Sequence, residues 1–401
     1  MKRIYSSLLE DHLAKNRQMI LLSGPRQVGK TTLARAVLPE AAYLNFDITG
    51  DAMKIMGGVE KIAEVLALDV PAKRARSVIF DELHKYAKWK HFLKGFFDRY
   101  EKDLKIVATG SARMDVYLRG GDSLMGRSFS YRVHPLSIGE LASAECNLET
   151  MFQAPKDVSH VEIARLLQFG GFPEPFLDGS RRFYTRWQNS RLDKIFNEDL
   201  RDLSRVQDLR GVKMLAELLR ARVSGEINHA SLGRDLGVSI DTVKNWIGLL
   251  ESVYFCYSVR PYFRNVANSI RKMPKIYLWD WSLIADKGAR NENFVASHLL
   301  KSVDWWTDSG LGRFELCYIR DKQQHEVDFV VTKEGEPLML VEVKSSLGEP
   351  LSPNLKAFAE KLKVKYAFQV AVEAEGAAIN PLDDAGRPVR VAFADLAKVL
   401  I

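Results

Sequence analysis

The segment 24–31 reads Gly-Pro-Arg-Gln-Val-Gly-Lys-Thr and contains every residue of a G-x-x-x-x-G-K-T phosphate-binding loop. In such a loop the backbone N–H groups surround an anion, and the helix that follows adds the positive end of its dipole. Lys30 is therefore expected to contact the β- and γ-phosphates of ATP, and the Thr31 hydroxyl to bind Mg²⁺. The residues expected to bind the nucleotide are Gly24, Pro25, Arg26, Gln27, Val28, Gly29, Lys30, Thr31 and Thr32.

Two acidic residues supply the second half of the expected site. Asp81 and Glu82 come directly after the apolar run 77–80, which has the composition of a buried parallel strand. Because ligands bind at the carboxyl ends of such strands, Asp81 is expected to hold Mg²⁺ and Glu82 to polarise the attacking water. A carboxylate pair alone is common in solvated turns. Its combination with the phosphate-binding loop indicates hydrolysis.

Hydroxyl side chains follow a third apolar run, 106–108. Thr109 is the first choice for a residue that orients the lytic water between Glu82 and the γ-phosphate, and Ser111 is the second. Capping of the turn is an equally good interpretation for either hydroxyl.

Arginine residues recur after this strand. An arginine finger supplies positive charge where the transition state of phosphoryl transfer develops negative charge. Arg127, which follows Gly126, is the favoured candidate for such a residue and would complete the site of a neighbouring subunit. The alternative is that the arginines in this run are solvated. The run contains Arg113, Arg119, Arg127 and Arg132.

A second set of residues that could form a catalytic site lies near the end of the chain. The runs 325–331 and 338–344 are typical of two strands, and the turn 333–336 joins them as a hairpin. Glu342 and Lys344 share one face, and Asp328 on the neighbouring strand is placed to meet them. This set resembles a PD-(D/E)xK nuclease site, in which Asp328 and Glu342 hold Mg²⁺ and Lys344 positions the water that the metal activates. Glu292 is expected to add a further carboxylate.

The alternative for this triad is a structural ion network. An alternating strand exposes charges at every second position without any chemistry. The neighbouring positions are strongly apolar, however, and an unpaired charge there is costly. The sequence leaves both interpretations open.

The middle of the chain is basic. Between residues 186 and 275 there are sixteen Lys and Arg against ten Asp and Glu, a surplus of six positive charges. Residues 228–247 read as helix, turn and helix, with Gly237 closing the first helix and Ser239 capping the second. A strand at 254–259 and a basic hairpin over 260–275 complete the pattern of a winged helix. Residues expected to contact DNA are Thr242, Lys244, Asn245, Arg264, Arg271 and Lys272.

DNA is the favoured partner of this region because winged helices commonly place the second helix in a groove while basic residues contact phosphate. The alternative is a winged helix that holds ATPase subunits together.

These sites require three structural parts. The strand 19–22 and the helix 31–36 must flank the phosphate-binding loop in an α/β ATPase domain. We expect this domain over residues 1–155, a helical and winged-helix region over 156–275, and a restriction-endonuclease-like α/β domain over 276–401. A chain of 401 residues is long enough for each part to bury its own core.

Composition agrees with a cytoplasmic globular protein. Hydrophobic residues make up 46% and charged residues 27% of the chain, and the formal net charge is +7. The three cysteines, Cys146, Cys256 and Cys317, lack metal-site spacing, which argues against a disulfide framework and against a zinc site. No apolar run approaches the roughly 20 residues that span a bilayer. No membrane partner is expected.

The chain resembles a prokaryotic AAA+ ATPase family whose members carry a C-terminal domain of unknown function. The resemblance rests on the loop at 24–32, on Phe80–Lys85, on 109–113 and on His134–Leu141. It continues through 170–174, 279–283 and 342–344 and so covers nearly the whole chain. A mild departure is the run Asp-Trp-Ser-Leu at 280–283, where members often have Asp-Asn-Gly-Leu.

The resemblance implies an AAA+ ATPase that forms a ring, with a hexamer favoured. Together with the basic middle it indicates Mg²⁺-dependent ATP hydrolysis that remodels or translocates DNA in replication or repair. Two alternatives stay open. One is an ATP-driven switch that acts on protein partners, and the other is an ATP-dependent DNA nuclease in defence.

Overall fold

The computed structural model describes residues 2–70, 75–102, 104–110, 124–142, 146–154, 157–203, 208–262, 273–376 and 380–401. Backbone contacts divide the chain into two compact units. Unit 1 comprises residues 1–134 with the short pieces 201–205 and 252–254, and unit 2 comprises 135–200, 206–251 and 255–401. The domain boundaries expected near residues 155 and 275 both lie within unit 2.

Unit 1 is built on a parallel five-stranded sheet in the order β2-β3-β4-β1-β5. The strand that precedes the phosphate-binding loop lies between β4 and β5. It is buried on both faces, as expected for a parallel sheet covered by helices. The strands are β1 (Met19–Ser23), β2 (Ala42–Asn45), β3 (Arg76–Asp81), β4 (Leu104–Thr109) and β5 (Ser128–Arg132).

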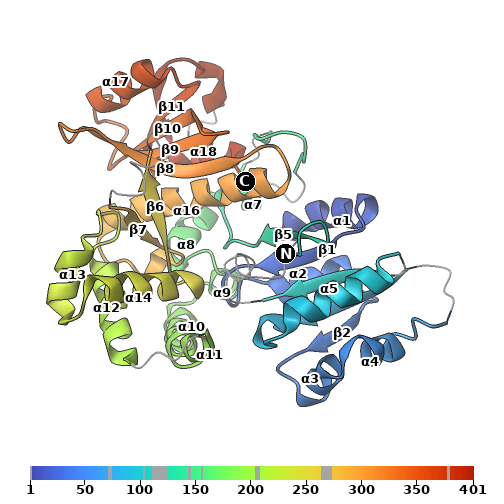
Figure 1. Cartoon of the computed structure of the whole chain (residues 1–401). Coiled ribbons are helices and arrows are strands. Elements are labelled where there is room, and N and C mark those ends of the chain that lie inside the picture. The colour runs from blue at the N-terminus through green and yellow to red at the C-terminus, as the bar shows by residue number, and fades with distance from the viewer. Residues whose placement is uncertain are drawn as a thin grey trace. The chain divides into compact units, whose positions relative to one another are not determined.

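Helices cover this sheet in Figure 1, where unit 1 runs from blue to cyan. Alternate residues of each strand point to opposite faces, so Leu21 and Phe80 pack with Phe92 and Phe96 of α5 in one apolar core. The helices are α1 (Tyr5–Lys15), α2 (Lys30–Val37), α3 (Thr49–Met56), α4 (Gly58–Val65) and α5 (Trp89–Tyr100), with the 3₁₀ turn η1 (Leu83–Lys85).

Unit 2 contains a mixed seven-stranded sheet in the order β12-β11-β10-β9-β8-β6-β7. The hairpin predicted around residues 333–336 is confirmed, since Lys333 of β9 pairs with Glu336 of β10 across Glu334 and Gly335. The strands are β6 (Cys256–Pro261), β7 (Lys275–Leu278), β8 (Phe314–Arg320), β9 (Glu326–Lys333), β10 (Glu336–Lys344), β11 (Tyr366–Ala371) and β12 (Pro388–Ala392).

Helices pack on this sheet and extend beyond it. Leu355 and Phe358 of α17 pack against Val327, Val330 and Leu340 of the sheet. The helices are α7 (Ile138–Ala142), α8 (His160–Phe169), α9 (Pro173–Asp178), α10 (Arg181–Lys194), α11 (Leu200–Leu203), α12 (Leu209–Ala221), α13 (His229–Leu236), α14 (Ile240–Ser252), α16 (Lys287–Asp308), α17 (Pro353–Leu362) and α18 (Phe393–Val399). Single turns are the π-helical η2 (Ile195–Asp199) and the 3₁₀ turns η3 (Trp281–Leu283) and η4 (Pro381–Asp384).

The region expected to be a winged helix is described over its two helices and only in part over its predicted hairpin. Helix α13 ends at Gly237, which has a φ of 68°, and Ser239 accepts the N–H of Thr242 at the start of α14, as predicted. The strands that follow, β6 and β7, pair antiparallel, and residues 263–272 of the predicted basic hairpin between them lie outside the described residues. Strand β6 pairs with β7 on one side and with β8 on the other, so both strands extend the large sheet. Sequence cannot reveal this pairing because β8 lies more than fifty residues further along the chain.

Three sequence motifs converge within unit 2. A Cβ added to Gly171 would lie 2.6 Å from the carbonyl oxygen of Leu136 and 2.6 Å from the ring of Trp281. The N–H of Leu136 donates to the carbonyl of Gly171 at 2.6 Å. The motifs around residues 136, 171 and 281 are thus held together by packing that excludes even a methyl group.

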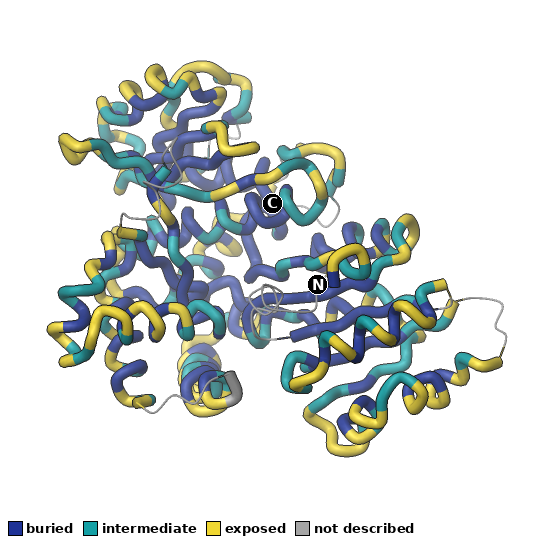
Figure 2. The backbone as a smooth tube through the Cα atoms, in the orientation of Figure 1, coloured by how far each residue is buried: buried dark blue, intermediate teal, exposed yellow. Residues whose placement is uncertain are grey.

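Burial follows this architecture. The strands of both sheets are largely buried, and the exposed positions lie mainly on the outer helices and turns (Figure 2). Within the described ranges, no helix is long and apolar enough to cross a membrane.

Candidate functional site

The phosphate-binding loop lies at the carboxyl end of the inner strand β1. Gly24 and Gly29 have φ values of 146° and 96°, and Gln27 between them has 64°. A Cβ on Gly24 would lie 2.3 Å from the carbonyl oxygen of Val133, so both conformation and space require glycine there. The loop therefore has the turns that aim successive N–H groups at one anion.

Lys30 is the first residue of α2 and is buried. Its Nζ donates to the carbonyl oxygens of Gly24 and Pro25, each at 2.8 Å. The ammonium group thus lies across the loop, in reach of any phosphate that the loop would bind. This is the location that the sequence predicts for it.

Three hydroxyl groups surround the Asp81 carboxylate at the end of β3. Thr31 Oγ1 lies 3.1 Å and 3.0 Å from its two oxygens, and Thr109 Oγ1 donates to Oδ1. Tyr43 donates to Oδ2 at 2.5 Å. The predicted metal residues Thr31 and Asp81 are therefore brought together, and Tyr43 is a partner that sequence reasoning missed.

Thr109 also accepts the backbone N–H of Glu82 at 3.4 Å. Its hydroxyl thus connects the ends of β3 and β4, which is the capping role that the sequence left as its alternative. Its role in orienting water stays a prediction. Ser111 lies outside the described residues.

Glu82 follows Asp81 in a left-handed conformation, with a φ of 54°. Its Oε2 lies 3.8 Å from Lys85 Nζ and 3.9 Å from His84 Nε2. Burial, and after it the nearby positive charges, lower the pKa of His84 to about 4, so this imidazole is neutral at pH 7. Asp81 is the last residue of strand β3, whereas Glu82 has a left-handed backbone conformation. The two consecutive carboxylates therefore point in different directions.

The residues present fit a nucleotide phosphate and its Mg²⁺. The loop supplies the tight turn that an anion-binding loop needs, Lys30 supplies charge, and Thr31 and Asp81 supply paired oxygen ligands. Bound Mg²⁺ would neutralise charge that develops on the phosphates. Thr31 and Asp81 would hold it.

Arg127, the candidate arginine finger, lies at the other end of the sheet. Its carbonyl accepts from the N–H of Met19, the first residue of β1, whereas the phosphate-binding loop follows the last. Its guanidinium pairs with Asp98 through Nε–Oδ1 and Nη2–Oδ2 contacts of 2.6 Å and 3.0 Å. Arg132 instead pairs in register with Ser23, beside the loop. Arg113 and Arg119 lie outside the described residues.

The predicted DNA-contacting residues are only partly described. Lys244 and Asn245 are exposed on α14, and Thr242 is half-buried at its start, where its Oγ1 lies 2.9 Å from Ser239 Oγ. Lys244 also lies 3.6 Å from Asp241, one turn earlier. Arg264, Arg271 and Lys272 lie outside the described residues.

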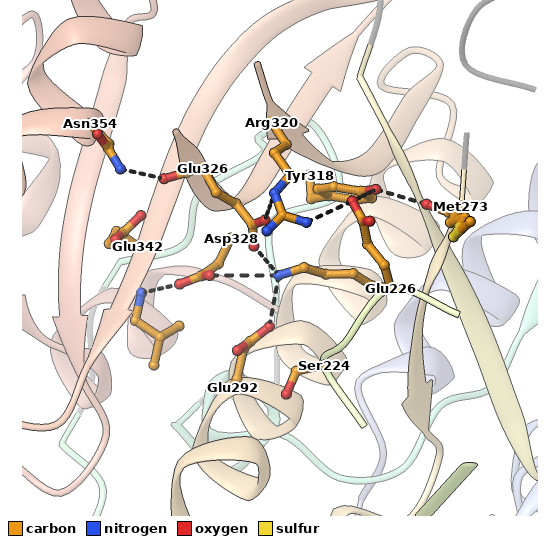
Figure 3. A network of polar contacts seen from close by, with 12 residues as sticks. Ser224, Glu226, Met273, Glu292, Tyr318, Arg320, Glu326, Asp328, Glu342 and Asn354 are labelled. Carbon is orange, nitrogen blue, oxygen red and sulfur yellow. Dashed lines mark hydrogen bonds and ion pairs between the residues drawn. The ribbon is translucent and has the colours of Figure 1, made fainter. Parts of the chain in front are cut away.

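The C-terminal carboxylates form a cluster around a buried lysine (Figure 3). Lys275 Nζ lies 2.5 Å from Glu326, 3.3 Å from Glu292 and 3.8 Å from Asp328. The side chain of Lys275 is only 5% exposed. The sequence placed Glu292 and Asp328 together correctly but did not identify the cation between them.

Glu342 lies beside this cluster. Asp328 accepts the N–H of Val343 at 2.8 Å, which places it next to the strand that carries Glu342. Lys344 donates to Glu342 Oε1 at 2.8 Å, while Oε2 is buried with no hydrogen-bond partner among the described residues. Burial, and then the charge of Asp328, raise the pKa of Glu342 to about 7.

The same causes raise the pKa of Glu292 to about 7, whereas the pKa of Lys275 is raised because its three carboxylate partners outweigh its burial. The cluster therefore already contains its own cation. Among the described residues, no group of three or more His, Cys, Asp or Glu side chains has the arrangement of a metal site. Asp328, Glu342, Lys344 and Glu292 are thus brought together, with Lys275 paired to Glu292 and Asp328 and Lys344 paired to Glu342. Their role as metal ligands stays a prediction, beside the alternative of an ion network.

Residues that sequence reasoning missed share one property. Tyr43, Lys275 and Glu326 each act on a partner from a different strand or helix, and none belongs to a recognisable motif. Tyr43 is not the residue opposite Asp81, which is Asn45, but its diagonal neighbour on β2, so only the register of β2 and β3 identifies it.

Family models match three stretches of the chain. Residues 16–142 match a model described as an AAA domain. Residues 161–291 and 287–385 match models described as domains of unknown function, DUF8612 and DUF4143. The parallel α/β unit is thus similar to AAA domains, and the C-terminal part is similar to the DUF4143 domain.

Relatives match most of the chain. An uncharacterized protein of Mycobacterium tuberculosis is 24% identical over 91% of this chain and 78% of its own length. An uncharacterized protein of Methanocaldococcus jannaschii is 23% identical over 88% of this chain and 81% of its own length. A solved structure of a Walker-type ATPase of Pyrococcus abyssi is 18% identical, with a TM-score of 0.43, over 69% of this chain and 93% of that chain.

Proposed function

We propose that unit 1 binds and hydrolyses ATP with Mg²⁺. The main support is the hydrogen bond between Thr31 and Asp81 at the carboxyl edge of the sheet. Lys30, next to Thr31 in the chain, contacts the phosphate-binding loop. Glu82 follows Asp81 and supplies the carboxylate that polarises the attacking water. Loop N–H groups and Lys30 bind the phosphates and oppose their charge.

The test is ATP turnover by the full chain with Mg²⁺, compared with two variants. Lys30→Ala is expected to lose nucleotide binding, because it removes the charge that contacts the phosphates. Glu82→Gln is expected to bind ATP but to turn it over at least about a hundred-fold more slowly, since general-base contributions are of this order. Equal turnover by the wild type and Glu82→Gln would contradict the assignment.

We further propose that this ATPase is an oligomer that acts on DNA. Support comes from the basic middle of the chain and from the exposed Lys244 and Asn245 on α14. The discriminating measurement is turnover without nucleic acid and then with single-stranded, duplex, forked and four-way-junction DNA. Stimulation by one form identifies a DNA remodeller, and turnover that ignores every form favours a switch that acts on protein partners.

Salt provides a second test of the DNA proposal. Affinity contributed by phosphate contacts falls steeply between low and physiological ionic strength. Lys244→Ala is expected to weaken DNA binding and to reduce this salt dependence. A complex that ignores salt would contradict a phosphate-binding surface.

Cleavage by the C-terminal cluster is a separate candidate activity. It is favoured by the buried Glu342 Oε2 beside Asp328 and Lys344 and disfavoured by the internal cation Lys275. The experiment is plasmid nicking with Mg²⁺ or Mn²⁺ by the wild type, Glu342→Ala and Lys344→Ala. Equal traces in all three would identify a contaminant.

A further inference from the structure

Tyr43 holds the carboxylate that the ATPase proposal assigns to the metal. Its hydroxyl donates to Asp81 Oδ2 at 2.5 Å, and Asp81 is 4% exposed. This tyrosine lies outside the phosphate-binding loop and outside the acidic pair. No motif in the chain includes it.

The pairing of β2 with β3 explains the contact. In the parallel register Tyr43 lies opposite Ile79 and Asn45 opposite Asp81, so Tyr43 and Asp81 are diagonal neighbours on one face of the sheet. Diagonal pairs are within reach only of long side chains such as aromatic residues. A tyrosine at this position can therefore place its hydroxyl on the carboxylate.

The carboxylate is held by donors from several elements. Thr109 at the end of β4 donates to Oδ1, Tyr43 on β2 donates to Oδ2, and Thr31 on α2 lies within 3.1 Å of both. Of these hydroxyls, Thr31 is the one expected to turn to Mg²⁺ when nucleotide binds. Tyr43 and Thr109 would then be the groups that keep Asp81 in place.

Tyr43 is itself fixed. The guanidinium carbon of Arg35 lies 3.7 Å from the centre of its ring, and Asn45 Nδ2 lies 3.4 Å from its hydroxyl. A tyrosine hydroxyl carries its proton in the neutral range and so can donate to the carboxylate.

We propose that Tyr43 is a positioning residue for Mg²⁺, because its hydroxyl fixes the orientation of the Asp81 carboxylate that would hold the metal. This inference rests on the proposed ATPase function and assigns a role within that site. Hydrogen bonds to a metal-ligating carboxylate fix its orientation, and their loss typically weakens metal affinity. Tyr43 acts through Asp81 and does not contact the substrate.

The test is the substitution Tyr43→Phe, which removes the hydroxyl and keeps the ring over Arg35. We expect the Mg²⁺ concentration at half-maximal ATP turnover to rise by about ten-fold, with turnover at saturating Mg²⁺ within about three-fold of the wild type. A second readout needs no turnover. By titration calorimetry, ADP should bind the variant as the wild type does in EDTA and should gain less affinity from added Mg²⁺.

Tyr100→Phe is the matched control. Tyr100 is a buried tyrosine of unit 1, at the end of α5, and it packs in the apolar core rather than against Asp81. Its variant is expected to keep the Mg²⁺ dependence of the wild type.

The outcomes separate this inference from the ATPase proposal. A wild type that neither binds ADP nor hydrolyses ATP would overturn the proposed function, whatever Tyr43→Phe does. An active wild type with an unchanged Mg²⁺ midpoint in Tyr43→Phe would overturn the role of Tyr43 alone. Equal loss of ADP affinity with Mg²⁺ and with EDTA would also overturn it, since it would indicate a general disturbance of the loop.

Discussion

Two constraints, the backbone conformation and the space for a side chain, both require glycine at position 24. Its φ of 146° lies in the region that favours glycine, and the carbonyl of Val133 leaves no room for a Cβ. Val133 follows β5, and its N–H donates to Ser23, so the close approach is fixed by strand pairing. The first residue of the phosphate-binding loop is thus shaped by the neighbouring strand as well as by its own turn.

Substitution of this glycine is expected to abolish tight nucleotide binding. In Gly24→Ala the added Cβ must displace either the loop or the chain at Val133. ADP affinity should fall by about 5-fold to 150-fold, since backbone strain of this kind costs on the order of 1–3 kcal/mol. Titration calorimetry with ADP measures this. The control is Gly50→Ala in α3, where nothing lies within 4 Å of the added Cβ. That variant should bind ADP normally and gain up to about 1 kcal/mol of stability. Equal behaviour of the two variants would contradict the steric argument.

At the scale of elements, strand β7 brings Lys275 into the C-terminal cluster. A buried cation among three carboxylates is stabilising only while the set is complete. We expect Lys275→Met to lower the free energy of unfolding by about 3–5 kcal/mol at neutral pH, because Glu292, Glu326 and Asp328 lose their shared partner. Urea unfolding measures the change.

Lys287→Met is the matched control for this prediction. Lys287 pairs with Glu373 at 2.7 Å, but its side chain is 67% exposed. A surface pair of this kind contributes less than about 1 kcal/mol. If Lys275→Met were as stable as this control, the cluster would not depend on its internal cation. Added Mn²⁺ that restores stability to Lys275→Met would indicate that Lys275 stands where a metal ion would lie.

Helix α16 carries a histidine that should make stability depend on pH. His298 Nε2 accepts the N–H of Ile138 at 3.1 Å, so Nδ1 carries the proton and donates to the Phe294 carbonyl at 2.7 Å. Burial lowers the pKa of His298 to about 3 from an ordinary value of 6.5. A proton added to Nε2 would remove the bond from Ile138.

Because the pKa of His298 is lower in the folded chain, the free energy of unfolding depends on pH. Below pH 6.5 the unfolded chain takes up a proton that the folded chain refuses until about pH 3, so stability falls as the pH falls through this window. The loss from His298 is about 1.4 kcal/mol per pH unit. The pKa of His84, lowered to about 4, acts in the same direction. His298→Gln should show a shallower fall between pH 7 and pH 5 in urea unfolding, and an unchanged slope would contradict the assignment.

At the scale of the whole molecule, the chain forms two units with separate cores and separate candidate sites. We expect ADP with Mg²⁺ to raise the unfolding temperature of unit 1, because a ligand present at a hundred times its Kd adds about 2.7 kcal/mol to the state that binds it. Scanning calorimetry of the full chain should show one transition that moves and a second that moves less.

Lys30→Ala supplies the control for that experiment. Its transitions should not respond to ADP, since the phosphate-binding charge is gone. A single transition that shifts as a whole in the wild type would contradict separate unfolding of the two units.

The sequence by itself determined the features that depend on neighbouring residues. The phosphate-binding loop, the acidic pair after β3, the β9–β10 hairpin and the caps at Gly237 and Ser239 all follow from short spacings with a local physical cause. The residue types there are dictated by backbone conformation or by chemistry that acts within a few positions. The parallel α/β architecture of unit 1 followed from the same spacings.

Tertiary structure decided which distant groups meet. Tyr43 reaches Asp81 across 38 residues because β2 pairs with β3, and Lys275 reaches Asp328 because β7 and β9 belong to one sheet. Strand β6 joins the same sheet through β8 for the same reason. Strand order and register are set by the burial of whole apolar faces, and no short segment carries that information.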